Sequence, residues 1–135
     1  MKTTIVLLTL ITFATYAQKT TRESVSNFRG MIITKVMTEV DTTFIMMGQN
    51  AQYSQIVDLI VIKHGSAQEI DELLTECMKL LPEKDGTSLE FNGNSIYSMG
   101  GNKLLLSGIG NDSRDSVLLN KGLITRLQTD LRKYL

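Results

Sequence analysis

Two stretches of the chain carry the apolar stripe of a helix, and every other apolar run is short and bounded by turn residues. In the first stretch, apolar residues recur at the three- and four-residue spacing of one helix face: Ile70, Leu73, Leu74, Cys77, Met78 and Leu81. Ser66 and Glu69 form a capping box before this stripe, and Pro82 ends it. Asn120 can cap a second helix, whose stripe is Leu123, Ile124, Leu127, Leu131 and Tyr134.

The remaining apolar runs predict about six strands. They cover residues 31–37, 43–47, 55–63, 88–91, 95–98 and 103–109, with a further short run at 117–119. Asn92-Gly93, a strong hairpin signal, lies between two of these runs, and hairpins connect antiparallel strands. No internal repeat is apparent. The sequence therefore predicts an α+β fold, with a mostly antiparallel sheet of about six strands and two helices packed on one face.

The first 17 residues have the layout of a secretory signal. Lys2 supplies the positive start, residues 5–13 are apolar, and Thr15 and Ala17 are small residues at an expected cleavage site. An apolar helix of that length reaches only about 14 Å, half of a bilayer core of about 30 Å. We therefore expect residues 1–17 to be a cleavable signal peptide, and the mature protein to be periplasmic or secreted without an integral membrane segment.

Charge and cysteine content limit what the rest of the chain can be. Residues 18–30 are polar, which predicts a flexible leader before a single domain over residues 31–135. The 14 basic and 14 acidic residues balance, so we expect no long-range attraction to nucleic acid. Because Cys77 is the only cysteine, no internal disulfide can form, and the hydrophobic core must stabilise the domain.

Cys77, His64 and Asp58 are the residues that most suggest catalysis. A cysteine nucleophile needs an exposed thiol with a lowered pKa and a histidine within hydrogen-bond reach. Cys77 instead falls on an apolar helix stripe, where a free cysteine serves as a small hydrophobic residue. We therefore interpret Cys77 as a core residue and His64 as a solvated turn residue, and we predict no catalytic residues.

The other polar clusters match no binding motif. Residues 108–112 and Asp115 lack the third glycine of a dinucleotide loop and the ligand spacing of a calcium loop. Asp71, Glu72 and Glu76 share one helix surface instead of facing each other across a cleft. One histidine and one cysteine cannot form a zinc site from those ligands. We therefore predict no metal and no cofactor.

Adjacent methionines give one hint of a contact surface. Met46 and Met47 must point to opposite sides of a strand, and an exposed methionine suits adaptable contacts. Our first hypothesis is an exported, non-enzymatic protein that binds another protein or an envelope component through a sheet face or edge. No nucleic-acid partner is expected.

Two alternatives stay open. One is a small secreted hydrolase that uses Cys77 with His64. The other is a carrier of a small apolar ligand, which would need a cavity bounded by residues of several elements: Met31, Phe44, Leu59 and Leu73.

Overall fold

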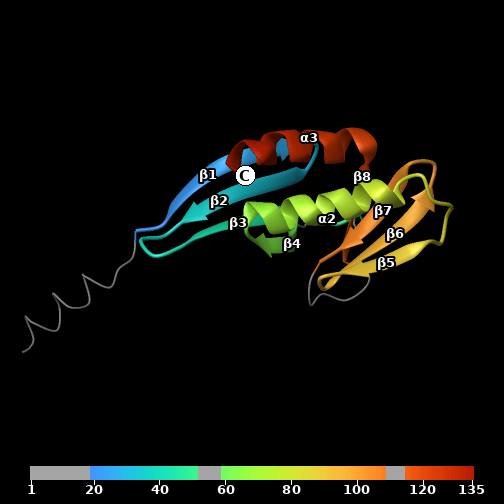
Figure 1. The fold of residues 1–135 in the computed structure, drawn as a ribbon, viewed down its shortest axis with the longest axis horizontal. Helices are drawn as coiled ribbons and strands as arrows, with labels where there is room; N and C mark the ends of the chain where they lie inside the picture. Colours follow the sequence, from blue (N-terminus) through green and yellow to red (C-terminus); the bar gives the residue numbers. More distant parts are fainter. Residues whose placement is uncertain (1–18, 52–58, 109–114) are drawn as a thin grey trace, which may run out of the picture.

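The computed structural model describes residues 19–51, 59–108 and 115–135, which form two sheets and two helices (Figure 1). Sheet A contains, in spatial order, β1 (Thr21–Phe28), β2 (Met31–Met37), β3 (Thr42–Gln49) and β4 (Leu59–Gly65). Helix α2 (Ala67–Leu80) follows. Sheet B contains β5 (Ser88–Phe91), β6 (Asn94–Gly100), β7 (Lys103–Ser107) and β8 (Ser116–Asn120). Helix α3 (Lys121–Leu131) and a 3-10 turn, η1 (Arg132–Tyr134), come last.

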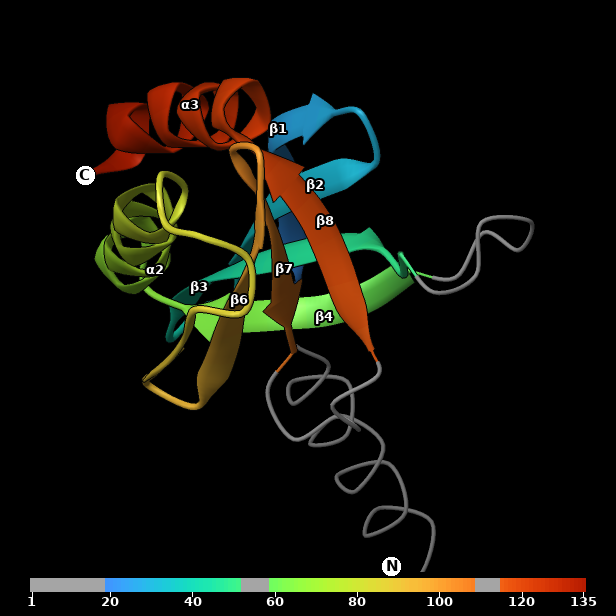
Figure 2. The ribbon, with the colours of Figure 1, turned by 90° about the vertical axis from the view of Figure 1, so that its right-hand side faces the viewer.

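The α+β class and the antiparallel pairing are confirmed, but the structure differs from the prediction of a single sheet of about six strands. Strands pair only with their neighbours in sequence, and β4 and β5 do not pair. Helix α2 has 14 residues and a length of about 21 Å, and it separates β4 from β5, which pairs with β6 in a second sheet. Both helices lie on the same side of the strands (Figure 2).

Strand β1 corrects the prediction that residues 18–30 are a flexible leader. Residues 21–28 pair with β2 along their whole length, and Arg29-Gly30 closes the hairpin with positive φ angles of 50° and 83°. Within β1, Ser26 is buried and its hydroxyl donates a 2.8 Å hydrogen bond to Asp130 in α3. This mostly polar strand is thus held by its partner strand and by a distant helix, and only Val25 and Phe28 pack against the core.

Both helices begin at the predicted caps. The Ser66 side chain accepts a hydrogen bond from the Glu69 N–H at 3.1 Å, and the Asn120 side chain accepts one from the Leu123 N–H at 2.9 Å. The predicted stripes are buried, except that Met78 and Tyr134 are only partly so. Each helix therefore contributes one apolar face to the interior.

A single core lies between the helices and the inner faces of both sheets. Its strand residues alternate with outward-facing ones: Met31, Ile33, Phe44, Met46, Ile60, Ile62, Ile96, Leu104, Leu106, Val117 and Leu119. Helix α2 contacts β3 and β4 of sheet A and also β5, β6 and β7 of sheet B. Helix α3 contacts β8 of sheet B and β1 of sheet A. The two sheets are therefore joined by shared helices into one domain.

The order of elements repeats, since four strands and a helix occur twice. Two short motifs repeat with it: Phe-X-Gly-X-X-Ile starts at Phe28 and at Phe91, and Ile-X-X-Leu-X-Thr starts at Ile70 and at Ile124. The first motif forms the two-residue turn and the strand that follows it, and the second lies on a helix. The prediction that the chain has no internal repeat is therefore wrong, since the order of elements repeats.

Several predicted features lie outside the described residues. These are the signal peptide over residues 1–17, the beginning of the run 55–63, and most of the loop 108–115. Among the helices that are described, none has the length and apolar character needed to cross a membrane.

Candidate functional site

The structure buries the one thiol. Cys77 lies on the inner stripe of α2 and is fully buried, as predicted. Burial raises the pKa of the Cys77 thiol to about 12, and the nearby Glu76 carboxylate adds to the rise. His64 is exposed near the end of β4. A buried thiol with this pKa is protonated at neutral pH, so the geometry gives no support to a nucleophilic role for Cys77.

The acidic residues singled out from the sequence are engaged with neighbouring side chains. Asp71 pairs with the Arg132 guanidinium at 3.1 Å, and Glu76 pairs with Lys79 at 2.8 Å. Asp115 accepts a 2.9 Å hydrogen bond from the Asn50 side-chain amide. Among the residues that the structure describes, no three His, Cys, Asp or Glu side chains are grouped so that they could hold a metal ion. Asp58, Asn111 and Asp112 lie outside those residues.

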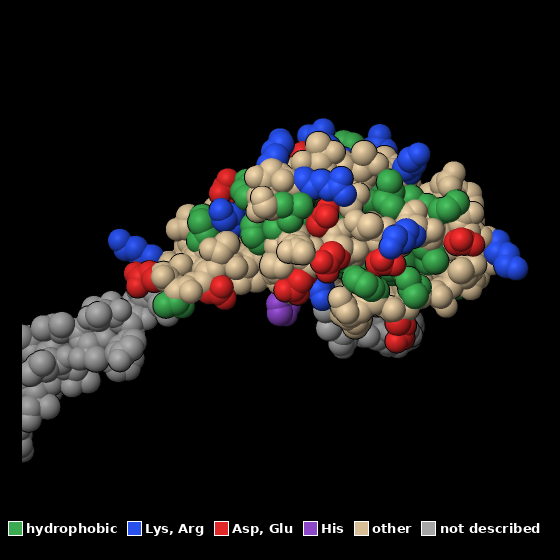
Figure 3. Space-filling view, viewed as in Figure 1, with side chains coloured by type: hydrophobic (Ala, Val, Ile, Leu, Met, Phe, Trp, Pro, Cys, Tyr) green, Lys and Arg blue, Asp and Glu red, His purple; other side chains and the backbone are tan. Residues whose placement is uncertain are grey.

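The outer face of sheet A is uncharged on three of its four strands, while Arg22 on the edge strand β1 pairs with Val36 and lies on the same side. We define it as the outward-facing positions of β2, β3 and β4: Ile32, Thr34, Val36, Thr43, Ile45, Met47, Gln49, Leu59, Val61 and His64. None of these is Lys, Arg, Asp or Glu. Leu59 and Val61 are 45% and 44% exposed, while Met46 is buried and Met47 lies on this face. On the helix-bearing side, by contrast, charges of both signs are scattered (Figure 3).

Sheet B also has apolar residues on its outer side. Tyr97, Leu105 and Leu118 pair across β6, β7 and β8 and form one row. Tyr97 and Leu118 are exposed, and Leu118 is 47% exposed. Hydrophobic side chains therefore point to solvent from both sheets, away from the helices.

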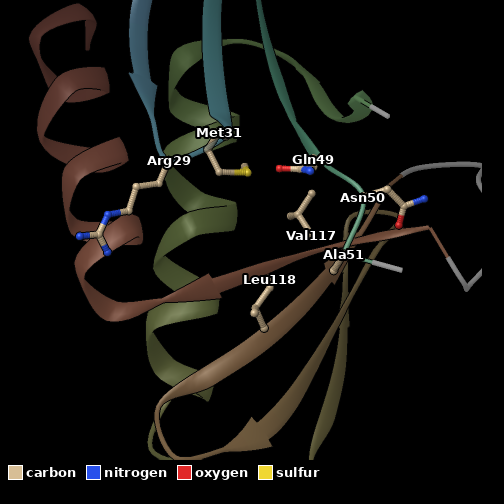
Figure 4. A pocket seen from close by; sticks show the side chains of 8 residues that line it. Arg29, Met31, Gln49, Asn50, Ala51, Val117 and Leu118 are labelled. Atoms are coloured by element: carbon tan, nitrogen blue, oxygen red, sulfur yellow. The ribbon is translucent and has the colours of Figure 1, made fainter. Parts of the chain in front are cut away.

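A cleft of about 350 Å³ lies where the two outer faces meet, and we call it the seam cleft. The cleft is lined by residues 29–31, residues 49–51, Val117 and Leu118. Gln49 and Met31 extend toward each other above Val117, while Arg29 points away from the cleft (Figure 4). The Arg29 guanidinium carbon instead lies 5.2 Å from the centre of the Phe28 ring. Few charged atoms therefore face the cleft.

A second depression of about 590 Å³ lies beside the beginning of α2. Phe44, Ala67 and Tyr134 supply its apolar surface, and Asp71 and Glu72 lie at the same site. Of the four residues proposed for an apolar cavity, Met31 lines the seam cleft and Phe44 lines this depression. Leu59 lies on the outer face of sheet A, so these four residues do not enclose one cavity.

Comparison with known proteins adds no relative. No family model matches the chain, and no curated protein or solved structure is detectably similar to it. Sequence reasoning missed the seam cleft, because the cleft joins a β1–β2 turn to β8, which lies far along the chain. The repeated Phe-X-Gly turn motif is the signal that could have directed attention to it.

Proposed function

We propose that this protein is an exported, non-enzymatic binding module that holds another protein against the outer faces of its two sheets. The uncharged outward-facing surface of β2, β3 and β4 is the observation that carries the proposal. Interface centres are depleted in charge, and contiguous exposed apolar surface on a folded domain marks interaction sites. The export step is supported by Lys2, the apolar run at residues 5–13 and the small residues before position 18.

The size of the surface indicates how far the partner extends. Three strands spaced about 4.8 Å apart, with about seven residues at 3.3 Å each, present roughly 330 Å² in plan. A specific interface takes about 800 Å² from each protein. The outer face of sheet A is therefore too small by itself, and the partner would also cover the seam cleft and the apolar row of sheet B.

A charge placed in the centre of the outer face tests this proposal. Val61→Glu puts a carboxylate among apolar neighbours. In the complex, this carboxylate would be buried with no opposite charge to pair with. We expect capture of the partner from the native envelope or medium to fall by at least about tenfold. Val40→Glu is the matched control, because Val40 is a valine that is 82% exposed in the β2–β3 turn.

Circular dichroism establishes that both variants are folded before capture is compared. Loss of one captured protein with Val61→Glu, and its retention with Val40→Glu, supports the proposal. Equal capture by both variants, or no specific capture by the unaltered protein, contradicts it.

A further inference from the structure

The two sheets have four edges, and two of these edges lie against the other sheet. Along β4, the Asn94 side-chain amide of sheet B donates a hydrogen bond to the Ile62 carbonyl at 2.8 Å. Along β8, the Ala51 N–H, just after sheet A, donates to the Ser116 carbonyl at 2.7 Å. We call these two contacts the seams. The row of inward-facing residues across each sheet, its inner row, ends in a seam, at Lys63 and at Val117. Among the described strands, β1 and β5 are therefore the remaining edges.

The edge at β1 is protected against further strands. Its register shifts between Ser24 and Ser26, which marks a β-bulge, and Arg22 and Glu23 put charges of both signs on the strand. A bulge and charged side chains are features that keep natural edge strands from pairing with another chain. Helix α3 also holds this strand, because Ser26 donates to Asp130.

The edge at β5 directs backbone hydrogen-bonding groups away from the sheet. The Ser98 N–H donates to the opposite Thr87 carbonyl at 2.7 Å, so these two residues form a hydrogen-bonded pair. Such pairs alternate along an antiparallel ladder, so Leu89 bonds to β6. The N–H and C=O groups of Ser88 and Glu90 therefore point away from β6, and both residues are exposed.

The two faces of β5 differ in chemistry. On the helix-bearing side, Leu89 is 38% exposed and Phe91 is only partly buried. Figure 3 shows hydrophobic side chains gathered over β5 on this side. On the outer side, Ser88 and Glu90 alternate with them, and the Ser95 hydroxyl lies 3.5 Å from the Glu90 carboxylate. A strand added at β5 would therefore meet apolar surface on one face and a negative charge on the other.

The length of β5 decides what kind of chain can add to it. Its four residues extend about 13 Å, and an added strand about 5 Å wide covers roughly 65 Å² in plan. A specific dimer takes about 800 Å² from each protein, so pairing with β5 of a second copy is too small to hold a dimer. A partner that covers the outer row of sheet B has no such limit, and that row reaches β5 because Ser88 pairs with Tyr97.

We propose that an extended segment of the partner protein adds to β5 as a further, antiparallel strand of sheet B. The backbone of this segment exchanges hydrogen bonds with Ser88 and Glu90. Its apolar residues pack beside Leu89 and Phe91, and the residue opposite Glu90 is basic. Antiparallel addition matches the other pairs of this sheet and is the more stable arrangement. This inference rests on the proposed function and names the part of the partner that reaches the edge of sheet B.

Titration of the isotope-labelled protein with a model peptide tests the edge directly. The probe is acetyl-Lys-Val-Lys-Val-Lys-Val-amide, which alternates basic and apolar residues. In antiparallel addition its lysine N–H groups point toward β5 and its valine N–H groups point away. Two matched peptides are therefore methylated on the backbone nitrogens of either the lysines or the valines. We expect saturable NMR shifts at the amides of Ser88 and Glu90, with a dissociation constant on the order of 1 mM for so short a peptide.

The two methylated peptides should differ in affinity. The lysine-methylated peptide should bind at least about tenfold more weakly than the probe, because it has lost the donors that face β5. The valine-methylated peptide should bind within about threefold of the probe, since its lost donors face solvent. Equal or reversed affinities of the two methylated peptides, or no saturable shift up to about 20 mM probe, overturn the inference.

Changes in β5 give the second measurement. Ser88→Pro removes an N–H that points to the edge, and proline is tolerated in an edge strand at such a position. Glu90→Lys reverses the charge opposite the lysines of the probe. We expect each folded variant to bind the probe at least about threefold more weakly.

The matched control for these variants is Glu39→Lys, which makes the same charge change in the exposed β2–β3 turn of the other sheet and should leave binding unchanged. Circular dichroism establishes folding, and Glu90→Lys keeps the test decisive if Ser88→Pro does not fold. Full binding of the probe by a folded β5 variant contradicts the inference.

The two proposals fail separately. If partner capture depends on Val61 but the probe does not bind at β5, the proposed function stands and the strand addition is wrong. If the probe binds and the β5 variants weaken its binding, yet no partner is captured, β5 accepts a strand and the proposed function is wrong.

Discussion

Gly48 is a point of close approach between the backbone of sheet A and a side chain of sheet B. A Cβ atom at this position would overlap with Met31 Sδ and with Val117 Cγ1. Methionine can move its sulfur away, but the branched side chain of Val117 is stiff and is held in β8. The absence of a side chain at Gly48 is therefore what allows the two sheets to meet at the floor of the seam cleft.

We predict that Gly48→Ala lowers the free energy of unfolding by about 1–3 kcal/mol, because an extra methyl group overpacks this contact. Urea unfolding measures the change. Gly122→Ala is the matched control, since Gly122 lies in the first turn of α3 and a Cβ there meets only Asn120 Oδ1 at 3.6 Å. It should stabilise the protein by about 0.5 kcal/mol, because alanine restricts the unfolded chain. A loss below about 0.5 kcal/mol in Gly48→Ala would show that the contact is loose.

Cys77 makes stability depend on pH in the alkaline range. Its folded-state pKa of about 12 lies above the ordinary value of 9.0. Above pH 9 the unfolded chain therefore releases the thiol proton while the folded chain keeps it, and stability falls as the pH rises. We predict a loss approaching about 1.4 kcal/mol for each pH unit between 9 and 12, beyond the loss seen in Cys77→Ala. Urea unfolding at pH 8, 9.5 and 10.5 gives the free energy of unfolding of both proteins. If this free energy depends on pH in the same way in both, the raised pKa of Cys77 is wrong.

Among the elements, the helix caps and strand β2 could be predicted from the sequence because their signals are local. The predicted run at 31–37 is β2 without a shift, and both helices start at the named caps. Strand β1 could not be predicted, because Ser26 and Glu23 bond to Asp130 and Tyr134 in the last part of the chain. The Asn92-Gly93 turn correctly predicted that β5 pairs with β6, but no local pattern shows that these strands form a sheet separate from sheet A.

The cap of α3 also joins that helix directly to β8. We predict that Asn120→Ala lowers the free energy of unfolding by about 1 kcal/mol, because the Leu123 N–H loses its acceptor at the start of the helix. Asn120→Asp is the control and should be close to neutral, since aspartate also caps and its charge suits the helix N-terminus. Thermal or urea unfolding measures both variants. Equal stability of the alanine and aspartate variants would show that the cap contributes little.

For the candidate site, the sequence predicted a few single residues correctly and missed the surface they belong to. The burial of Cys77 follows from its place on a helix stripe, and alternation places Met46 and Met47 on opposite faces. The seam cleft depends on the meeting of Met31 and Val117, which are in different halves of the repeat. To predict such a contact, one must know how the two sheets are placed relative to each other. No run of neighbouring residues specifies this placement.

At the scale of the whole molecule, the repeat produces two equivalent seams that are filled by different side chains. Both halves use the same turn, the same strand order and the same capped helix. They differ at the residue that ends the inner row, which is Lys63 in one half and Val117 in the other. The motif positions Asn94 and Met31 differ as well, and all four of these side chains are buried, so the two halves fill their seams with different residues.

The proposed role also requires that the protein leaves the cytoplasm without residues 1–17. We predict that the full chain, expressed in a bacterium with a secretory pathway, yields a mature protein whose first residue is Gln18. Ala17→Leu should block cleavage, because a signal peptidase accepts only a small side chain directly before the cut. Ala14→Leu makes the same change three residues earlier, where size is tolerated, and should be processed normally. Intact mass and cell fractionation distinguish the outcomes. A chain that keeps Met1 and stays in the cytosol would show that residues 1–17 are not a signal, and a binding role outside the cell would then be wrong.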